Sequence, residues 1–311
     1  MDLQVGYGVR ITPSGGSATL IGGVTNQSMP IDTEQNAEAT AGSYFAHHGE
    51  ITRVQPRGLF SSYQVADVID LLGLTGACLA GGESPGFEMW ELALDACGKQ
   101  KVGATDHRKL VIPNGLVVAR SISASHRQPA TIACEVMSIY DGTNDPLIIT
   151  ESQPAPTGLS DSFRYTMGPV TIGGQAIEGN LSVEIDLGNG AATDGGDSEP
   201  FDTHIQIPQV IPTITISTRD VKKFAESVVP LRGLHGTHAN TSIILRRRVN
   251  GTASFSDAAD SIEITADVMC NFDDVFNAQA ASRGQASLRL TALHDGTNSP
   301  LVFDTSYDLV P

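Results

Sequence analysis

Apolar and polar residues alternate along several short segments of this chain, as they do in β-strands that bury one face. Over residues 180–187, apolar side chains occupy every second position. Residues 212–216 and 261–265 alternate in the same way and are rich in β-branched side chains, which favour strands. The pattern predicts a mainly β protein, with further strands at 110–112, 116–120, 131–139, 147–150, 285–293 and 301–304.

Helical spacing of apolar residues stands out in two segments, one in each half of the chain. Each stripe follows a hydroxyl residue that can cap a helix and precedes a residue that stops one. We therefore expect one helix per half, lying against a sheet. The first has Ser61 or Ser62 as cap, the stripe Val65, Val68, Ile69 and Leu72, and the stop Gly73; the second has Ser217 or Thr218, the stripe Val221, Phe224, Ala225 and Val228, and the stop Pro230.

A seven-residue motif occurs twice, which indicates a duplication. Residues 141–147 read DGTNDPL, and residues 295–301, 154 positions later, read DGTNSPL. Two further matches keep the same order, 62–69 with 218–225 and 21–23 with 172–174. We predict two tandem homologous domains, 1–155 and 156–311, each a β-sandwich or barrel with one α-helix packed on its sheet. The proline-rich residues 153–158 suit a linker.

Composition and charge narrow the possible partners. The net charge of −16 divides into −7 for residues 1–155 and −9 for residues 156–311, so both halves are acidic. An acidic surface argues against tight binding of phosphates, but it would repel a DNA backbone that only passes by. With 32 glycines and 5 % aromatic residues, each half has a thin core, which favours burial against a neighbouring subunit.

Cysteine spacing and hydropathy bear on the compartment. Cys78, Cys97, Cys134 and Cys270 show no paired spacing, and three of them lie in the first half, so we expect free thiols in a reducing compartment. No stretch approaches the roughly 20 apolar residues of a membrane-spanning helix. We therefore expect a protein made in a cytoplasm, without a membrane segment.

Candidate chemistry is sparse. The repeated motif contains Asp-Gly, which supports a tight turn, and we interpret it as a hairpin turn in preference to a calcium loop. Two histidine pairs, 47–48 and 235/238, lack the further ligands of a metal site, and Glu88 and Glu91 fall on opposite faces of a strand around Trp90. We find no nucleophile or phosphate-loop motif and expect no enzyme, no cofactor and no metal. The turn residues are Asp141, Gly142 and Asn144 in the first copy and Asp295, Gly296 and Asn298 in the second.

Two charged segments are candidates for contacts between subunits. The run Arg246, Arg247 and Arg248 stands where the first half has an aspartate, and arginine binds carboxylates in a two-pronged geometry. The glycine-rich segment 189–200 is expected to be a solvated loop, or one that orders against a neighbouring subunit. Its counterpart near 33–43 is also expected to lack strands. The acidic candidates in the 189–200 loop are Asp194, Asp197 and Glu199.

The duplicated β-rich halves with one helix each, the loop before each helix and the acidic charge resemble the tube domain of bacteriophage tail tube proteins. The resemblance covers nearly the whole chain and rests on its architecture and on the repeat of 141–147 at 295–301. It is to the fused form found in some flexible-tailed phages, whose subunits carry two such domains and form trimeric, pseudo-sixfold rings. It implies stacked rings whose sheets join around a DNA channel, an acidic lumen, loops that reach the adjacent ring, contacts with other phage tail proteins, and a location in the virion tail after synthesis in the host bacterial cytoplasm.

Three alternatives remain open. A baseplate hub or distal tail protein can use the same paired domain. A sliding-clamp-like DNA ring is also a trimer of duplicated acidic subunits, although such clamps carry two lysine-bearing helices per domain and this chain has five lysines. A carbohydrate-binding β-sandwich or a hydrolase would need an exposed aromatic platform.

Overall fold

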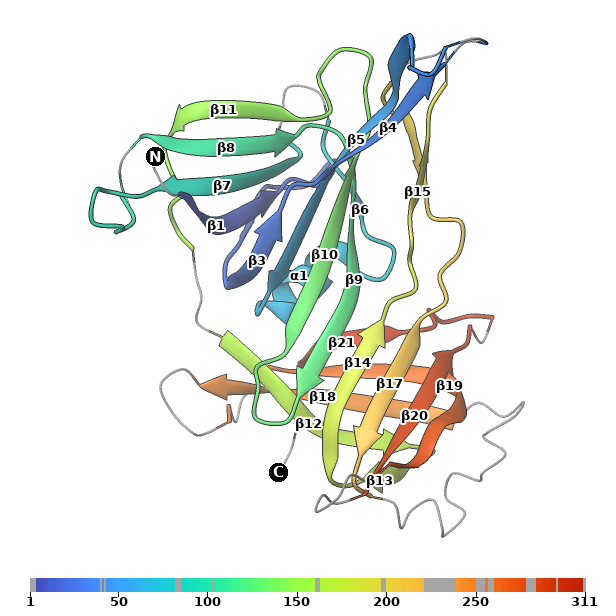
Figure 1. Cartoon of the computed structure of the whole chain (residues 1–311). Helices are drawn as coiled ribbons and strands as arrows, with labels where there is room; N and C mark the ends of the chain where they lie inside the picture. The colour runs from blue at the N-terminus through green and yellow to red at the C-terminus, as the bar shows by residue number, and fades with distance from the viewer. Residues whose placement is uncertain are drawn as a thin grey trace.

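The structure is a computed structural model in which strands dominate (Figure 1). It describes residues 4–309 except 40, 42, 82–84, 102, 104, 160–162, 197–199, 221–238, 250–254, 257–259, 278–283 and 295. A mainly β fold, as predicted from the alternating pattern, is confirmed.

A small antiparallel sheet belongs entirely to the first half of the chain. Its strands, in order across the sheet, are β11 (Ile148–Gln153), β8 (His107–Ile112), β7 (Phe87–Ala93), β1 (Gln4–Ile11) and β2 (Thr19–Ile21). One face of this sheet contributes Val9, Ile11, Phe87 and Met89 to the core, where all four are buried.

A large antiparallel sheet runs through both halves of the chain. Its order is β13 (Gln175–Ile177), β12 (Phe163–Ile172), β18 (Ala239–Val249), β19 (Ser261–Asn277), β20 (Gln285–Ala292), β17 (Thr213–Thr218), β14 (Asn180–Asp186), β9 (Gly115–Ser125), β10 (Thr131–Ser138), β5 (His48–Ser62) and β3 (Val24–Ser28). Off this path, β21 (Val302–Tyr307) pairs with β19, β4 (Ile31–Glu38) with β5, and β6 (Ala77–Cys78) with β9. A separate two-stranded ribbon joins β15 (Ala192–Asp194) to β16 (His204–Gln206).

The alternating segments become strands with one buried face, as predicted. In β17, the side chains of Ile214 and Ile216 are fully buried, and the alternating residues Thr213, Thr215 and Ser217 face the other side. The alternation also predicts β20, where every second residue is buried, and β14, where Val183 and Ile185 are buried and Leu181 is half-buried. The buried faces of these strands form one continuous hydrophobic core with the helix.

The first predicted helix is α1 (Val65–Leu72), and its apolar stripe is buried as expected. Gly73 follows it with φ of 57°, a conformation that glycine adopts without strain. The capping prediction is wrong, because Gln64 precedes the helix and Ser62 instead ties two loops together. Its Oγ donates to the carbonyl of Gly22 at 2.7 Å and accepts from the amide of Gln64 at 2.9 Å. The second predicted helix, with Val221, Phe224, Ala225 and Val228, lies outside the described residues.

Strands pair in the same order in the two halves. In the first half β11-β8-β7-β1-β2 and β9-β10-β5-β3 are neighbours, and in the second half β21-β19-β18-β12-β13 and β19-β20-β17-β14 follow the same plan. The single long strand β19 takes the places of both β8 and β9. Both β3 and β14 shift register one residue after their first pair, at Thr25 and Leu181.

Hydrogen bonds around the loop before the helix recur at an offset of 156 residues. The amide of Gly22 donates to Gln64 Oε1 (2.6 Å), and that of Glu178 donates to Asp220 Oδ2 (3.1 Å). Thr218 Oγ1 repeats the bond of Ser62 by donating to the carbonyl of Glu178 at 2.7 Å. The match of 21–23 with 172–174 is therefore wrong: 21–23 corresponds to 177–179, because the β1–β2 connection is five residues longer than the β12–β13 turn.

Two local predictions are wrong, because a pattern of apolar residues does not show which strands pair. Residues 33–43 are not strandless, since β4 covers 31–38 and pairs with β5 over its whole length. The motif at 141–147 is not a hairpin turn, because β10 before it and β11 after it belong to different sheets. The motif at 295–301 likewise connects β20 to β21, which do not pair.

Candidate subunit interface

The two halves join through β9 and β14, which pair directly. Ile122 lies opposite Ile185, and Ala124 lies opposite Val183, with all four side chains buried. Beyond the paired residues, the amide of Leu187 donates to the carbonyl of Arg120 at 2.9 Å. The sheets of the halves therefore form one surface without a break.

Two hairpins extend from this junction side by side (Figure 1). The first is β4–β5, and the second is β15–β16. The backbone amide of Val54 on β5 donates to the carbonyl of Pro200 in the second hairpin at 2.7 Å. Corresponding residues of the two hairpins are also 156 positions apart. Glu38 pairs with His48 in the first hairpin, and Asp194 pairs with His204 in the second.

Arg53 holds the two hairpins together. Its Nε lies 3.2 and 3.1 Å from the two carboxylate oxygens of Asp202, and its Nη2 lies 2.6 Å from Oδ2. Nη2 also donates to Thr193 Oγ1 at 2.8 Å, and Gln55 Nε2 donates to the same oxygen at 2.7 Å. Burial raises the pKa of Asp202, but the hydrogen bonds from Arg53 and Thr193 outweigh it, so that the pKa of this carboxyl lies below its usual range. We call this cluster the hairpin clasp.

An aromatic contact continues the clasp towards the first copy of the repeated motif. The rings of Tyr140 and Phe201 lie 5.5 Å apart, tilted by 44°. The amide of Tyr140 donates to the carbonyl of Asp202 at 2.8 Å. Directly after Tyr140, Asp141 Oδ1 accepts from the amides of Thr143 and Asn144 (2.9 and 2.7 Å), and these bonds lower the pKa of Asp141.

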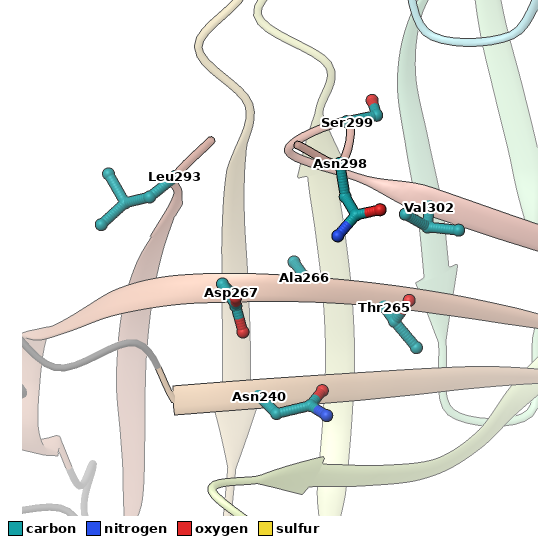
Figure 2. A pocket seen from close by; sticks show the side chains of 8 residues that line it. All are labelled: Asn240, Thr265, Ala266, Asp267, Leu293, Asn298, Ser299 and Val302. Carbon is teal, nitrogen blue, oxygen red and sulfur yellow. The ribbon is translucent and has the colours of Figure 1, made fainter. Parts of the chain in front are cut away.

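The predicted turn residues include a glycine with positive φ in each copy. Gly142 and Gly296 have φ of 84° and 92°. Asn144 Nδ2 donates to Asp141 Oδ2 at 2.9 Å, and Asn298 lines a pocket of about 200 Å³ beside β19. In Figure 2 the amide of Asn298 reaches from the loop towards β19. Asp295 lies outside the described residues.

The predicted arginine run lies on β18 and makes contacts inside its own half. The guanidinium of Arg246 lies 3.9 Å from the ring centre of Phe255, and that of Arg248 lies 5.8 Å from the same ring. Arg247 pairs with Asp260. All three side chains are half-buried, so their role in a subunit contact stays a prediction.

The predicted acidic loop residues have mixed outcomes. Asp194 is exposed on β15, and its carbonyl accepts from the amide of Thr203 within the hairpin. Asp197 and Glu199 lie outside the described residues. The sequence analysis did not identify the clasp residues Arg53 and Asp202. The available signal is that His48 and Pro56 recur 156 positions later as His204 and Pro212, which relates the two hairpin segments.

The remaining chemical candidates that the structure describes form ion pairs. Glu88 is buried between Arg10 Nη1 and Lys109 Nζ, each 2.9 Å away, and Arg10 also lies 5.0 Å from the ring centre of Trp90. Glu91 pairs with Arg108. His48 is exposed, and its Nε2 lies 3.8 Å from Glu50. His235 and His238 lie outside the described residues.

The cysteines and the possible metal ligands are the last candidates for a chemical site. All four cysteines are free, and burial raises the pKa of Cys270 to about 12. Within the described part of the chain, no group of three or more His, Cys, Asp or Glu side chains is placed to hold a metal ion. The same residues include no helix long and apolar enough to cross a membrane.

The open face of the large sheet is covered by short hydroxyl side chains. It lies opposite the buried core face, and directly paired residues show which side chains share it. A row of serines at 125, 182, 217 and 287 crosses four strands. Charges of both signs accompany them, since Glu184 and Asp186 share a small pocket with Arg289. The hydroxyl residues are Ser61, Ser121, Ser123, Ser125, Thr131, Ser182, Thr213, Thr215, Ser217, Ser287 and Thr291.

No protein-family model matches the chain, and no curated protein sequence matches it significantly.

Proposed function

We propose that the protein is a structural subunit of a bacteriophage tail, and that three copies form a ring of six similar units that stacks into the tail tube. It would be made in the host cytoplasm and reside in the virion, with itself and other tail proteins as partners. The proposal needs two homologous tube domains in tandem, and the common strand order of the halves and the 156-residue offset of their hydrogen bonds support that duplication.

The single observation that carries the proposal is the β9–β14 junction. It joins two similar sheets edge to edge within one chain. Among the described residues this leaves β3 at one end of the sheet and, on the other side, residues 269–277 of β19, which pair with β20 alone. An open edge tends to pair with another chain, and successive edge-to-edge joining of twisted sheets leads to a closed barrel. Repetition of the same junction between chains would therefore build a ring.

The open sheet face suits the wall of a channel. Short hydroxyls bind water and present no cationic array that would hold a phosphate backbone. This face carries charges of both signs, so we propose that hydroxyls, more than the repulsion of an acidic lumen, keep passing DNA from sticking. The strands of this face carry no lysine among the described residues, which favours a conduit over a DNA-clamping ring.

Electron microscopy of the concentrated protein, and of virions that contain it, tests the proposal. We expect hollow tubes built from rings with threefold symmetry and six similar subunit lobes. A protein that stays monomeric at high concentration and is found in no tubular particle would refute it. Copy number separates the tube from the baseplate alternative, because a tube needs many copies per particle and a hub needs three to six.

A further inference from the structure

The internal junction buries or packs apolar residues whose counterparts, at an offset of 156 residues, are exposed away from the junction. Leu187, next to β9, is fully buried, whereas its counterpart Ile31 at the start of β4 is 49 % exposed. Phe201 packs on Tyr140, whereas its counterpart Phe45 is 78 % exposed. Exposed apolar side chains that gather on one surface mark a contact with a partner. The surface around Ile31 and Phe45 therefore carries the same kind of apolar side chains that form the internal junction.

Ile211, in the second half of the chain, shows the same relation. Its counterpart at the 156-residue offset is Gln55, which is 6 % exposed because the second hairpin covers it and Thr193 accepts its hydrogen bond. Ile211 itself is 49 % exposed. The counterpart of Thr193 is Ala37 on the first hairpin. A polar pair inside the chain, Gln55 with Thr193, therefore corresponds to an apolar pair, Ile211 with Ala37, that the chain cannot form with itself.

The aromatic contact has an open counterpart as well. Tyr140 corresponds to His294 at the 154-residue offset of the repeated motif, and His294 is exposed. Beside it lies the pocket of about 200 Å³ shown in Figure 2, lined by Asp267, Leu293 and Asn298. Asp267 and Leu293 correspond to Asn114 and Ile139, and the backbone bond from Leu293 to Asp267 (2.8 Å) repeats the bond from Ile139 to Asn114 (3.1 Å).

The strands β9 and β19 share a bulge that supports the same correspondence. The bulge that leaves Arg120 unpaired in β9 recurs in β19 at Asp273. Inside the chain, the amide of Leu187 donates to the carbonyl of Arg120. By the same correspondence, the amide of Ile31 in one copy would donate to the carbonyl of Asp273 in the next. We define the β3–β4 side by β3, β4 and Phe45, and the β19 side by β19, His294 and Ile211.

We propose that the β3–β4 side of one copy docks on the β19 side of the next, in the register of the internal β9–β14 junction. Phe45 then packs on His294 beside the pocket, Ala37 covers Ile211, and Ile31 lies against β19 at Asp273. The contact is head-to-tail, and such a contact builds a ring when the rotation between copies closes, which the proposed threefold ring requires. This inference rests on the proposed ring and adds the residues and register of its subunit contact.

Cross-linking between chains tests the register. In a Cys78→Ser, Cys97→Ser background, Phe45→Cys and His294→Cys chains are mixed and treated with a short bismaleimide. We expect a cross-linked dimer from the mixture and none from either chain alone. A chain that carries both cysteines should give a ladder that ends at the ring. The matched internal control, Tyr140→Cys with Phe201→Cys, should cross-link within one chain.

Substitution on the β19 side provides the second readout. Ile211→Asn should abolish rings and tubes and leave a folded monomer, because the side chain is half-exposed in the single chain. Leu59→Asn, at a half-exposed leucine on the open sheet face, should leave assembly unchanged. Tubes that form without the Phe45–His294 cross-link would overturn this interface and spare the proposed function. Cross-linking of Phe45→Cys to itself would also overturn it, and a protein without any ring would overturn both.

Discussion

The hairpin clasp makes a quantitative prediction that isolates one contact. Arg53→Met removes the guanidinium that binds Asp202 and leaves a carboxylate that is 7 % exposed without its main partner. Hydrogen bonds to charged groups contribute about 1.5–3 kcal/mol, and since Arg53 is one-third exposed we expect a loss of about 2 kcal/mol. The loss acts on the docking of the second hairpin, where it corresponds to an increase of about thirtyfold in the population of the undocked state.

Hydrogen exchange at two amides measures this opening. The amides of Val54 and Tyr140 both donate to carbonyls of the second hairpin, at Pro200 and Asp202. We expect their exchange to accelerate by about thirtyfold in Arg53→Met.

The matched control removes a different partner of the same arginine. Glu34 is exposed where it pairs with Arg53, so Glu34→Gln should cost less than about 0.5 kcal/mol. Equal exchange rates in Arg53→Met and the wild type, or equal effects of both substitutions, would refute the reasoning.

Acid weakens the same clasp. The pKa of Asp202 lies below its unfolded value, so its contribution is complete above about pH 4 and is lost as the pH falls through the folded pKa. Exchange of the two reporter amides, corrected for intrinsic rates, should therefore accelerate below about pH 4 in the wild type, and an Asp202→Asn variant should lose this pH dependence.

Three further predictions concern the sheet. Gly115→Ala should destabilise the fold by at least about 2 kcal/mol in urea unfolding, because φ is 150° and the added carbon would lie 1.9 Å from the carbonyl oxygen of Met137; an unchanged midpoint would contradict this strain. Ile185→Ala removes a fully buried side chain at the junction of the halves and should cost about 2–5 kcal/mol, and a loss below about 1 kcal/mol would show that the junction is loosely packed. Ser217→Lys on the open face should leave stability within about 0.5 kcal/mol and make purified tubes retain DNA at low salt, whereas tubes that release DNA as freely as the wild type would place this face outside the channel.

Strands with one buried face could be predicted from the sequence because burial leaves a period of two. The same rule explains the missed strand at 31–38, all of whose side chains are exposed, so that no alternation marks it. Its partner β5 forms the pairing, and pairing is not visible in a pattern of apolar residues. The apolar stripe of α1 was predicted because it packs on the core, whereas its start was misplaced because Ser62 binds Gly22, 40 residues away.

The functional surface was less accessible to sequence reasoning because its contacts join distant residues. Arg53 and Asp202 are 149 positions apart, and each alone resembles an ordinary surface charge. The repeated motif contains Gly142, which has a positive φ, but it did not predict how the strands around it pair, since topology decides which sheet each strand enters. The offset of 156 residues carried more information than any motif, because it relates buried residues to exposed counterparts such as Leu187 to Ile31.

A high-resolution electron-microscopy structure of the assembled particle tests the central claim most directly. The account predicts that the contact between neighbouring chains superimposes on the β9–β14 contact inside each chain, with Ile31 and Phe45 buried at the places that Leu187 and Phe201 occupy internally. A particle whose chains meet through a twofold contact, or through surfaces that leave Ile31 and Phe45 exposed, would contradict it.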